Sequence, residues 1–425
     1  MSADYEALSP ARRSVSPIVV IGVLFFIMGW FTWINGSLIS FVQLAFELDV
    51  FNAFLVTFVF YLSYFVLALP ASLILDRTGM KKGMALALWV MAAGAFAFGE
   101  FCTRRWYPGA LSGLFVIGAG LAILQTAANP YVSILGPIES AAQRIAIMGI
   151  CNKVAGIAAP ILLGSLVLHG MDDIAARVAT ADAAEKARIL GDFASGIHAP
   201  YLLMATMLAL LGFGILFSPL PDVRAERGTS SNAATAAAGS LFHYPHVWLG
   251  ALAIFVYVGA EVMAGDAIGT YGRGFGIPFD QTKYFTAGTL GAMLAGYLAG
   301  FAMIPRFVSQ QRYLAFSAVL GIVLTLGAFL TSGYVSVGCV AALGFANAMM
   351  WPAIFPLAIH GLGRLIERGS ALLIMGIAGG ALIPQAFALL RQTHDFQGVF
   401  ALLMVPCYAY IAYFALRGYR AGRSA

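Results

Sequence analysis

The sequence predicts an all-α membrane protein of twelve transmembrane helices, arranged as two bundles of six. Of its 425 residues, 61% are hydrophobic and only 10% are charged, whereas a soluble domain carries about 25% charged residues. Its apolar segments are long enough to cross a bilayer, which takes about 20 helical residues. The 47 glycines favour the same class, because small residues let membrane helices approach closely.

Twelve apolar segments follow one another, and we expect each to be one span. They cover residues 17–42, 51–75, 83–101, 108–135, 143–168, 198–219, 244–268, 283–304, 313–332, 335–359, 370–390 and 396–416. A polar segment rich in Ala, Ser, Thr and Gly separates the sixth from the seventh and is typical of a flexible linker. We therefore expect a first bundle over 1–219, a linker over 220–243 and a second bundle over 244–425.

The distribution of basic residues predicts that both termini lie in the cytoplasm. The side that holds the termini and the linker carries fifteen of the 24 Lys and Arg residues, the other side carries eight, and Lys153 lies inside a span. Excess positive charge marks the cytoplasmic side, so the net charge of +5 does not indicate nucleic-acid binding.

A polar excursion over 170–197 would lie outside, with a short amphipathic helix. It is either an idle hairpin or a lid over an outer vestibule.

The loop after the second span, LPASLILDRTGMKKGM, combines charges with a glycine. A tight turn needs a glycine that tolerates positive φ, which Gly79 would supply. Asp76 at a helix end can pair with basic residues and with a neighbouring helix N-terminus. Asp76, Arg77 and Gly79 are therefore candidates for a charged latch that forms in one packing of the helices and breaks in another.

This loop resembles the G-x-x-x-D-R-x-G-x-K/R loop of the major facilitator superfamily. The resemblance implies two six-helix bundles around a central cavity lined by the first, fourth, seventh and tenth spans. Transporters of this kind hold substrate near the midplane and rock their halves alternately. The corresponding loop after the eighth span keeps Arg306 but has no acid, so the latch would be asymmetric.

Polar side chains inside the spans predict the chemistry of the substrate. Carboxamides both donate and accept hydrogen bonds, so they match sugar hydroxyls, and an aromatic face packs against a sugar ring. The candidate sugar-binding residues are Asn35, Gln125, Asn129, Asn152, Asn347 and Trp351, with Trp33 and Tyr257 as further aromatic candidates. The alternative is that each carboxamide joins two helices, a contact worth about 0.6 kcal/mol on average.

Two charged residues lie deep inside spans, Lys153 in the fifth and Glu261 in the seventh. Ionisable groups at such depth are functional by default. We expect Glu261 to be the coupling group, through protonation or Na⁺ binding, with Lys153 as its electrostatic partner; the alternative is a static salt bridge. Asp266 lies closer to the outer mouth, and we expect it to be solvated. We expect no other metal site and no cofactor beyond H⁺ or Na⁺.

The stretch LQTAANPYVSILGP resembles the fucose, glucose–galactose and N-acetylglucosamine permease family, as do NGSLI and GPIESAAQRIAIMGICNKVAGIAAPILLG. IFVYVGAEV places the chain closer to the glucose–galactose branch. The resemblance implies sugar uptake coupled to H⁺ or, in some members, Na⁺. The fucose-permease pattern has an Asp where Gly36 stands here and a Glu where Gln125 stands, which puts direct transfer of its proton mechanism in doubt.

The predicted function is uptake of a neutral sugar, a hexose or N-acetylhexosamine, by cation-coupled symport through the cytoplasmic (inner) membrane. The expected partners are the sugar and the lipid bilayer, without nucleic acid, and we expect a monomer. The alternatives are an exporter of amphipathic compounds and a non-transporting sugar receptor. An enzyme is not expected, because the sequence has no nucleophile–base constellation, metal-ligand cluster or phosphate-binding loop.

Overall fold

The computed structural model describes residues 17–134, 141–218, 220, 241–304, 306–362 and 365–422, and their regular structure is helical. Within these residues, twelve helical stretches are long and apolar enough to cross a membrane. The predicted fold class and number of spans are therefore confirmed.

The first six stretches are formed by α1 (Pro17–Trp33), α2 (Asn35–Ala45), α3 (Val50–Ala53), α4 (Leu55–Thr78), α5 (Met80–Thr103), α6 (Tyr107–Ile134), α7 (Ala141–Leu166), α9 (Ala183–Ser195) and α10 (His198–Phe217), with α8 (Met171–Thr180) between α7 and α9. The other six are formed by α11 (Pro245–Gly265), α13 (Phe279–Thr282), α14 (Phe285–Met303), α15 (Gln310–Leu330), α16 (Gly333–Asn347), α17 (Met350–Ile359), α18 (Ile366–Met375), α19 (Gly379–Leu390) and α20 (Phe396–Leu416), with α12 (Ile268–Arg273) between α11 and α13. Short 3₁₀ turns lie at Leu241–His243, Gly376–Ala378 and Gly418–Arg420.

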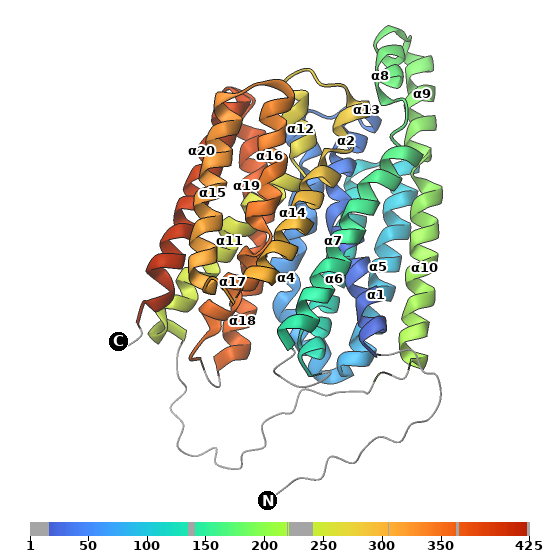
Figure 1. Cartoon of the computed structure of the whole chain (residues 1–425). Coiled ribbons are helices and arrows are strands. Elements are labelled where there is room, and N and C mark those ends of the chain that lie inside the picture. Colours follow the sequence, from blue (N-terminus) through green and yellow to red (C-terminus); the bar gives the residue numbers. More distant parts are fainter. Residues whose placement is uncertain are drawn as a thin grey trace, which may run out of the picture.

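The two sets of helices stand side by side, blue to green on the right and yellow to red on the left (Figure 1). Helices α8 and α9 project at one end, which we call the α8–α9 end. Helix α1 begins and α20 ends at the other, which we call the opposite end (Figure 1). The halves meet along α7 and α14 and along α4 and α19, so these four helices form the seam between them.

Three spans are interrupted where their polar residues lie. The first is broken at Ile34, beside Asn35; the seventh ends its long helix just before Asp266; and the tenth is broken directly after Asn347. Discontinuous membrane helices are typical of transporter binding sites, because the break exposes backbone groups at membrane depth. Each of these breaks therefore lies next to a buried polar residue, Asn35, Asp266 or Asn347.

The excursion over 170–197 forms two helices, so the prediction of a single helix is wrong. Ala181 is extended, with φ −75° and ψ 150°, and the side chain of Asp182 accepts the Glu185 N–H at 2.8 Å. This cap starts α9 and separates it from α8. Helix α9 buries Leu190 and Phe193, and the ring centroids of Phe193 and Phe41 of α2 are 5.2 Å apart. Helix α9 therefore packs on the bundle.

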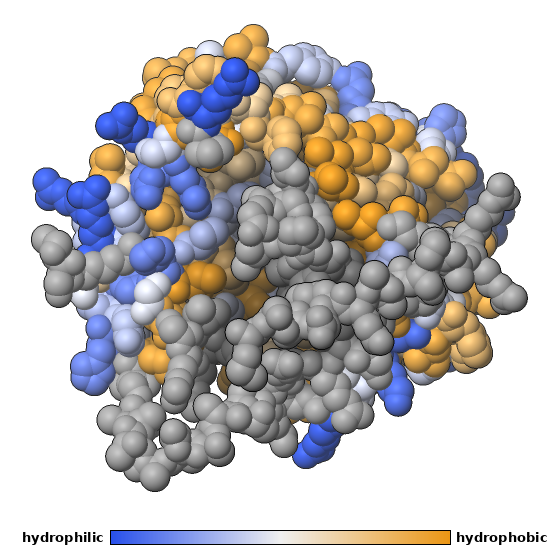
Figure 2. Space-filling model, turned by 60° about the horizontal axis from the view of Figure 1, so that its bottom comes forward, coloured by the Kyte–Doolittle hydropathy of each residue, from blue (hydrophilic) through white to orange (hydrophobic). Residues whose placement is uncertain are grey.

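Large apolar side chains cover the outside of the bundle. Phe217 is 86% exposed, Leu330 78% and Leu166 71%, and hydrophobic atoms cover much of the side surface beyond the hydrophilic residues at the opposite end (Figure 2). Soluble monomers rarely expose apolar surface on this scale. With the twelve spans, this surface makes the chain a multi-pass membrane protein.

The turn between α4 and α5 has the predicted backbone. Gly79 closes α4 and opens α5 with φ 78° and ψ 167°, which glycine adopts without the penalty of a side chain. Arg77 is exposed, whereas the Asp76 side chain lies outside the described residues. Lys81 donates to the carbonyl of Ser218, the residue after α10, at 2.7 Å. This contact lies within one half, so the latch stays a prediction. The linker predicted over 220–243 also lies largely outside the described residues.

Candidate functional site

A buried ion pair joins the two halves near their centre. Lys153 Nζ of α7 lies 3.3 Å from Glu261 Oε1 of α11, and their side chains are only 7% and 13% exposed. The same Nζ lies 4.2 Å from the centre of the Trp33 ring, where a cation gains from the negative face of the indole. The structure thus brings Lys153 and Glu261 together, while their role in coupling stays a prediction. Removing one partner of such a pair costs about 3–5 kcal/mol, because the other charge stays buried.

Trp33 links this ion pair to a predicted sugar-binding residue. Its Nε1 donates to Asn152 Oδ1 at 3.3 Å, while Asn152 Nδ2 donates to the Phe25 carbonyl at 3.4 Å. A Cβ added to Gly156 or Gly265 would lie 2.6 Å from the indole ring. Trp33 is therefore held between a glycine of each half, and this packing requires both positions to lack a side chain.

The fourth span contributes a half-buried carboxamide. Gln125 Nε2 donates to the Tyr64 hydroxyl at 3.2 Å, and the Tyr64 ring stacks on Tyr61 with centroids 6.3 Å apart. Thr126 Oγ1 donates to the Ala122 carbonyl within its own helix. Helix α6 continues past Asn129, whose side chain lies outside the described residues. Gln125 is therefore the polar side chain of this face that the structure places beside α4.

Asn35 and Asn347 are fully buried. In each, one of the two polar atoms of the carboxamide makes a hydrogen bond to the protein. Tyr408 of α20 donates to Asn347 Oδ1 at 2.9 Å, and Asn35 Nδ2 donates to the Thr32 carbonyl at 3.1 Å. Asn347 Nδ2 and Asn35 Oδ1 make no hydrogen bond to any described residue. Both thus keep one polar atom for another partner. Trp351, four residues after Asn347, is half-buried at the start of α17.

Asp266 corrects a prediction. We expected it to be solvated, but it is 1% exposed. The N-terminal half covers it: a Cβ added to Gly36 would lie 3.0 Å from Asp266 Cα and 2.6 Å from Thr286 Oγ1. Position 36 is where the fucose-permease pattern carries an acid, so here a carboxyl group approaches from the other half. The signal in the sequence was that Asp266 falls within the predicted seventh span, five residues after Glu261.

The halves are also tied together at the α8–α9 end. The Asp172 carboxylate, in the first turn of α8, accepts the backbone N–H groups of Phe279 and Asp280 at 3.0 Å each. Lys283 Nζ donates to the Leu168 carbonyl at 3.1 Å and to Asp280 Oδ1 at 2.8 Å. Charge-assisted hydrogen bonds of this kind are the strong ones. They join the N-terminal half to the C-terminal half at this end of the molecule.

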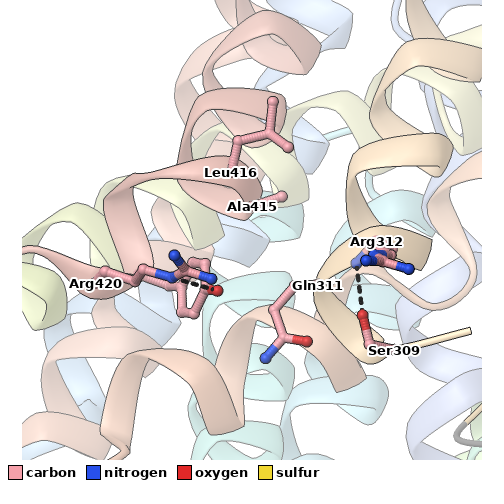
Figure 3. A pocket seen from close by; sticks show the side chains of 7 residues that line it. Ser309, Gln311, Arg312, Ala415, Leu416 and Arg420 are labelled. Atoms are coloured by element: carbon pink, nitrogen blue, oxygen red, sulfur yellow. Dashed lines mark hydrogen bonds between the residues drawn. The ribbon is translucent and has the colours of Figure 1, made fainter. Parts of the chain in front are cut away.

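A separate pocket of about 440 Å³ opens at the opposite end, between the start of α15 and the end of α20 (Figure 3). Its lining consists of Ser309, Gln311, Arg312, Ala415, Leu416, Tyr419 and Arg420. All of these belong to one half, and none is a predicted sugar-binding or coupling residue. The candidate site is therefore the polar region between the halves and not this pocket.

Comparison with known proteins decides the family. The family model of the Major Facilitator Superfamily matches residues 21–384. The chain belongs to the major facilitator superfamily. A glucose/galactose transporter of Brucella abortus is 35% identical over 93% of this chain and 92% of its own length. An L-fucose-proton symporter of Escherichia coli is 26% identical over 95% of this chain and 93% of its own length.

The solved structures agree with this assignment to the major facilitators. The crystal structure of the transporter FucP in the outward conformation superposes with a TM-score of 0.75 at 26% identity, covering 97% of this chain and 100% of that one. The predicted resemblance to the fucose and glucose–galactose permeases is confirmed, and this major facilitator is more similar to the glucose/galactose relative than to the fucose one.

Proposed function

We propose that this major facilitator takes up a neutral sugar, a hexose or N-acetylhexosamine, across the cytoplasmic membrane by alternating access coupled to a cation. Relatives named glucose/galactose transporter and L-fucose-proton symporter, similar over almost the whole chain, support the substrate class. The proton named in the second supports H⁺ as the coupling ion, with Na⁺ as the alternative.

We assign sugar binding to the carboxamides between the halves, Asn35, Gln125, Asn129, Asn152 and Asn347, with Trp351 packing on the ring. The free ends of Asn35 and Asn347 support this assignment, because a buried polar atom without a partner is costly and a sugar hydroxyl can pair with either. The protein would work as a monomer with both termini in the cytoplasm. Asp76, Arg77 and Gly79 would form a charged latch that is made in one packing of the helices and broken in another.

The observation that carries the coupling proposal is the Lys153–Glu261 pair, because it spans the halves that alternating access must separate. When the pair opens, Glu261 loses its cation and can take a proton or Na⁺ instead. When the pair forms, Glu261 releases that ion. Glu261 is thus the coupling group and Lys153 its partner.

The test is uptake of labelled glucose, galactose, fucose and N-acetylglucosamine into proteoliposomes under a proton gradient, a Na⁺ gradient or neither. We expect gradient-driven accumulation of at least one sugar by the wild type and its loss in Glu261→Gln. Glu185→Gln, a change of the same type on exposed α9, is the matched control and should accumulate sugar normally.

Other outcomes would redirect the proposal. If Glu261→Gln keeps uphill uptake with unchanged pH and Na⁺ dependence, Glu261 is not the coupling group. If Lys153→Met leaves affinity and coupling untouched, its pairing is structural only. Sugar binding without counterflow would indicate a receptor, and resistance to amphipathic drugs without sugar accumulation would indicate an exporter.

A further inference from the structure

Three ionisable groups are gathered where the halves meet. Lys153 is hydrogen-bonded to Glu261, and Asp266 interacts electrostatically with both. The phenol of Tyr61, on α4, also interacts electrostatically with Asp266 and adds no positive charge. One ammonium group can balance only one carboxylate, and Glu261 already occupies it. With both carboxyl groups ionised, the cluster would carry an uncompensated negative charge.

Asp266 is the carboxyl group left without a partner. It is 1% exposed, and neither of its oxygens makes a hydrogen bond of normal geometry to the described residues. The backbone N–H of Gly36 faces the carboxylate but is a neutral donor. An isolated ionised carboxylate away from water is costly, and such a group normally becomes neutral. The second positive charge that the cluster needs, a proton or a metal cation, is therefore expected at Asp266.

The backbone around Asp266 favours a proton over Na⁺. A sodium ion needs several oxygen ligands, and in broken transporter helices these are typically free carbonyls at the helix end. The carbonyls of Ala264 and Gly265 already accept the hydroxyls of Thr289 and Thr286, both at 2.8 Å. A proton needs one carboxylate oxygen and no such cage.

Closure of the α8–α9 end buries Asp266. On one side Gly36 lies against it, and Trp33 packs against the adjoining Gly265. Both belong to the N-terminal half, whereas Asp266 belongs to the C-terminal half. Separation of the halves at this end would remove both covers and let water reach the carboxylate. Asp266 would then be ionised while the α8–α9 end is open, and it would hold a proton once that end has closed, until water reaches it from the opposite end.

We propose that Asp266 carries the coupling proton: the α8–α9 end closes only after a solvent proton binds its carboxylate. The proton adds to a carboxylate oxygen, no bond is broken, and the buried cluster becomes neutral. Water that enters from the opposite end takes the proton away. This inference rests on the proposed function and adds a second carboxyl group to it, while Glu261 remains paired with Lys153 in the closed state.

The test measures proton movement in proteoliposomes with a pH-sensitive dye. Labelled glucose or galactose, whichever the wild type exchanges, is added without any imposed gradient. We expect the wild type to move protons with the sugar and Asp266→Asn to exchange the sugar without them. An imposed gradient of about one pH unit supports about tenfold accumulation per proton, and Asp266→Asn should show none. Asp192→Asn, an exposed acid of α9, is the matched control.

Wild-type proton movement and pH-driven accumulation in Asp266→Asn would overturn the inference. If that variant also lost exchange, Asp266→Glu would decide: sugar exchange with proton movement supports the inference, and exchange without it contradicts the inference. A readout independent of transport is the infrared band of a protonated carboxyl group in purified, monodisperse protein. Its presence in the wild type and absence from Asp266→Asn supports the inference, and its presence in both contradicts it.

If the wild type transported no sugar, the proposed function would fail first. The infrared measurement would still show whether Asp266 holds a proton, so the two failures are distinguishable. The Glu261→Gln variant gives a further test. Without the Glu261 carboxylate, the Lys153 ammonium group can balance an ionised Asp266, so Asp266 no longer needs a proton. Its protonated-carboxyl band should also disappear, although Asp266 is intact.

Discussion

At the scale of single residues, the buried hydrogen bond between Asn347 and Tyr408 could serve helix packing, sugar binding or both. The hydroxyl of Tyr408 donates to Asn347 Oδ1 at 2.9 Å, and both residues are fully buried. The contact joins α16 to α20, as an interhelical hydrogen bond would. It also fixes the rotation of the carboxamide and leaves Nδ2 free for a sugar hydroxyl. Stability and affinity therefore report on different atoms of the same side chain.

We expect Tyr408→Phe to destabilise the protein by about 1–3 kcal/mol, because it leaves a buried acceptor unsatisfied. The measurement is the thermal unfolding midpoint in detergent, with sugar affinity determined on the same samples. Tyr413→Phe, at a 46% exposed position of the same helix, is the control and should leave the midpoint unchanged. Equal midpoints for the two variants would mean that the bond contributes little to folding.

Sequence reasoning found the residues whose chemistry is unusual for their surroundings. Lys153 and Glu261 are charges inside apolar segments, so they were identified, and their pairing required only that two spans approach. Asp266 was misjudged because its solvation depends on Gly36 of the other half. No local pattern records a contact made across 230 positions of the chain. For the same reason the sequence did not identify Tyr408 as the hydrogen-bond partner of Asn347.

At the scale of helices, glycine sets how closely α1 and α7 approach. A Cβ added to Gly29 would overlap the backbone carbonyl of Asn152, whereas one added to Gly22 would meet only the tips of Cys151 and Met148 at 3.8 Å. Both glycines lie on α1 and face α7. Close approach at Gly29 places Asn152 next to Trp33, so helix packing and the candidate site are linked.

We expect Gly29→Ala to destabilise the protein by about 1–3 kcal/mol, the usual cost of overpacking, and to weaken sugar affinity by displacing Asn152. Gly22→Ala should change neither. Thermal unfolding and equilibrium sugar binding check both variants. A Gly29→Ala protein as stable and as tight-binding as Gly22→Ala would show that α1 and α7 separate without cost.

The spans themselves were predictable, because length and hydropathy are local properties. Their interruptions were not, since Asn347 ends a helix inside an unbroken apolar segment. The second helix of the 170–197 excursion was missed because its start depends on the Asp182 cap, a weak signal in a stretch rich in alanine. Local propensity thus located the helices, and tertiary contacts decided where they break.

At the scale of the whole molecule, several hydrogen bonds join the two halves at the α8–α9 end. Asp172 provides two of them, through the N–H groups of Phe279 and Asp280. These bonds join α8 to α13 and must break when the halves separate there. The solved structure of FucP, which has a similar fold, is in the outward conformation.

We expect Asp172→Ala to shift the population toward the state open at the α8–α9 end. Hydrogen bonds to a charged group contribute about 1.5–3 kcal/mol each, so losing one or more changes the ratio of states by about tenfold or greater. Spin labels at Ser195→Cys and Thr393→Cys, exposed positions of the two halves in a cysteine-free background, would report the separation as a distance distribution.

Asp173→Ala is the matched control for this shift. Both acids lie in the first turn of α8, where a negative charge stabilises the helix N-terminus, but Asp173 is exposed. A difference between the variants therefore isolates the contact with α13 from the effect on α8 itself. Identical distance distributions in the two variants would mean that Asp172 does not hold this end closed, and that the packing of Gly36 and Trp33 against the C-terminal half does so alone.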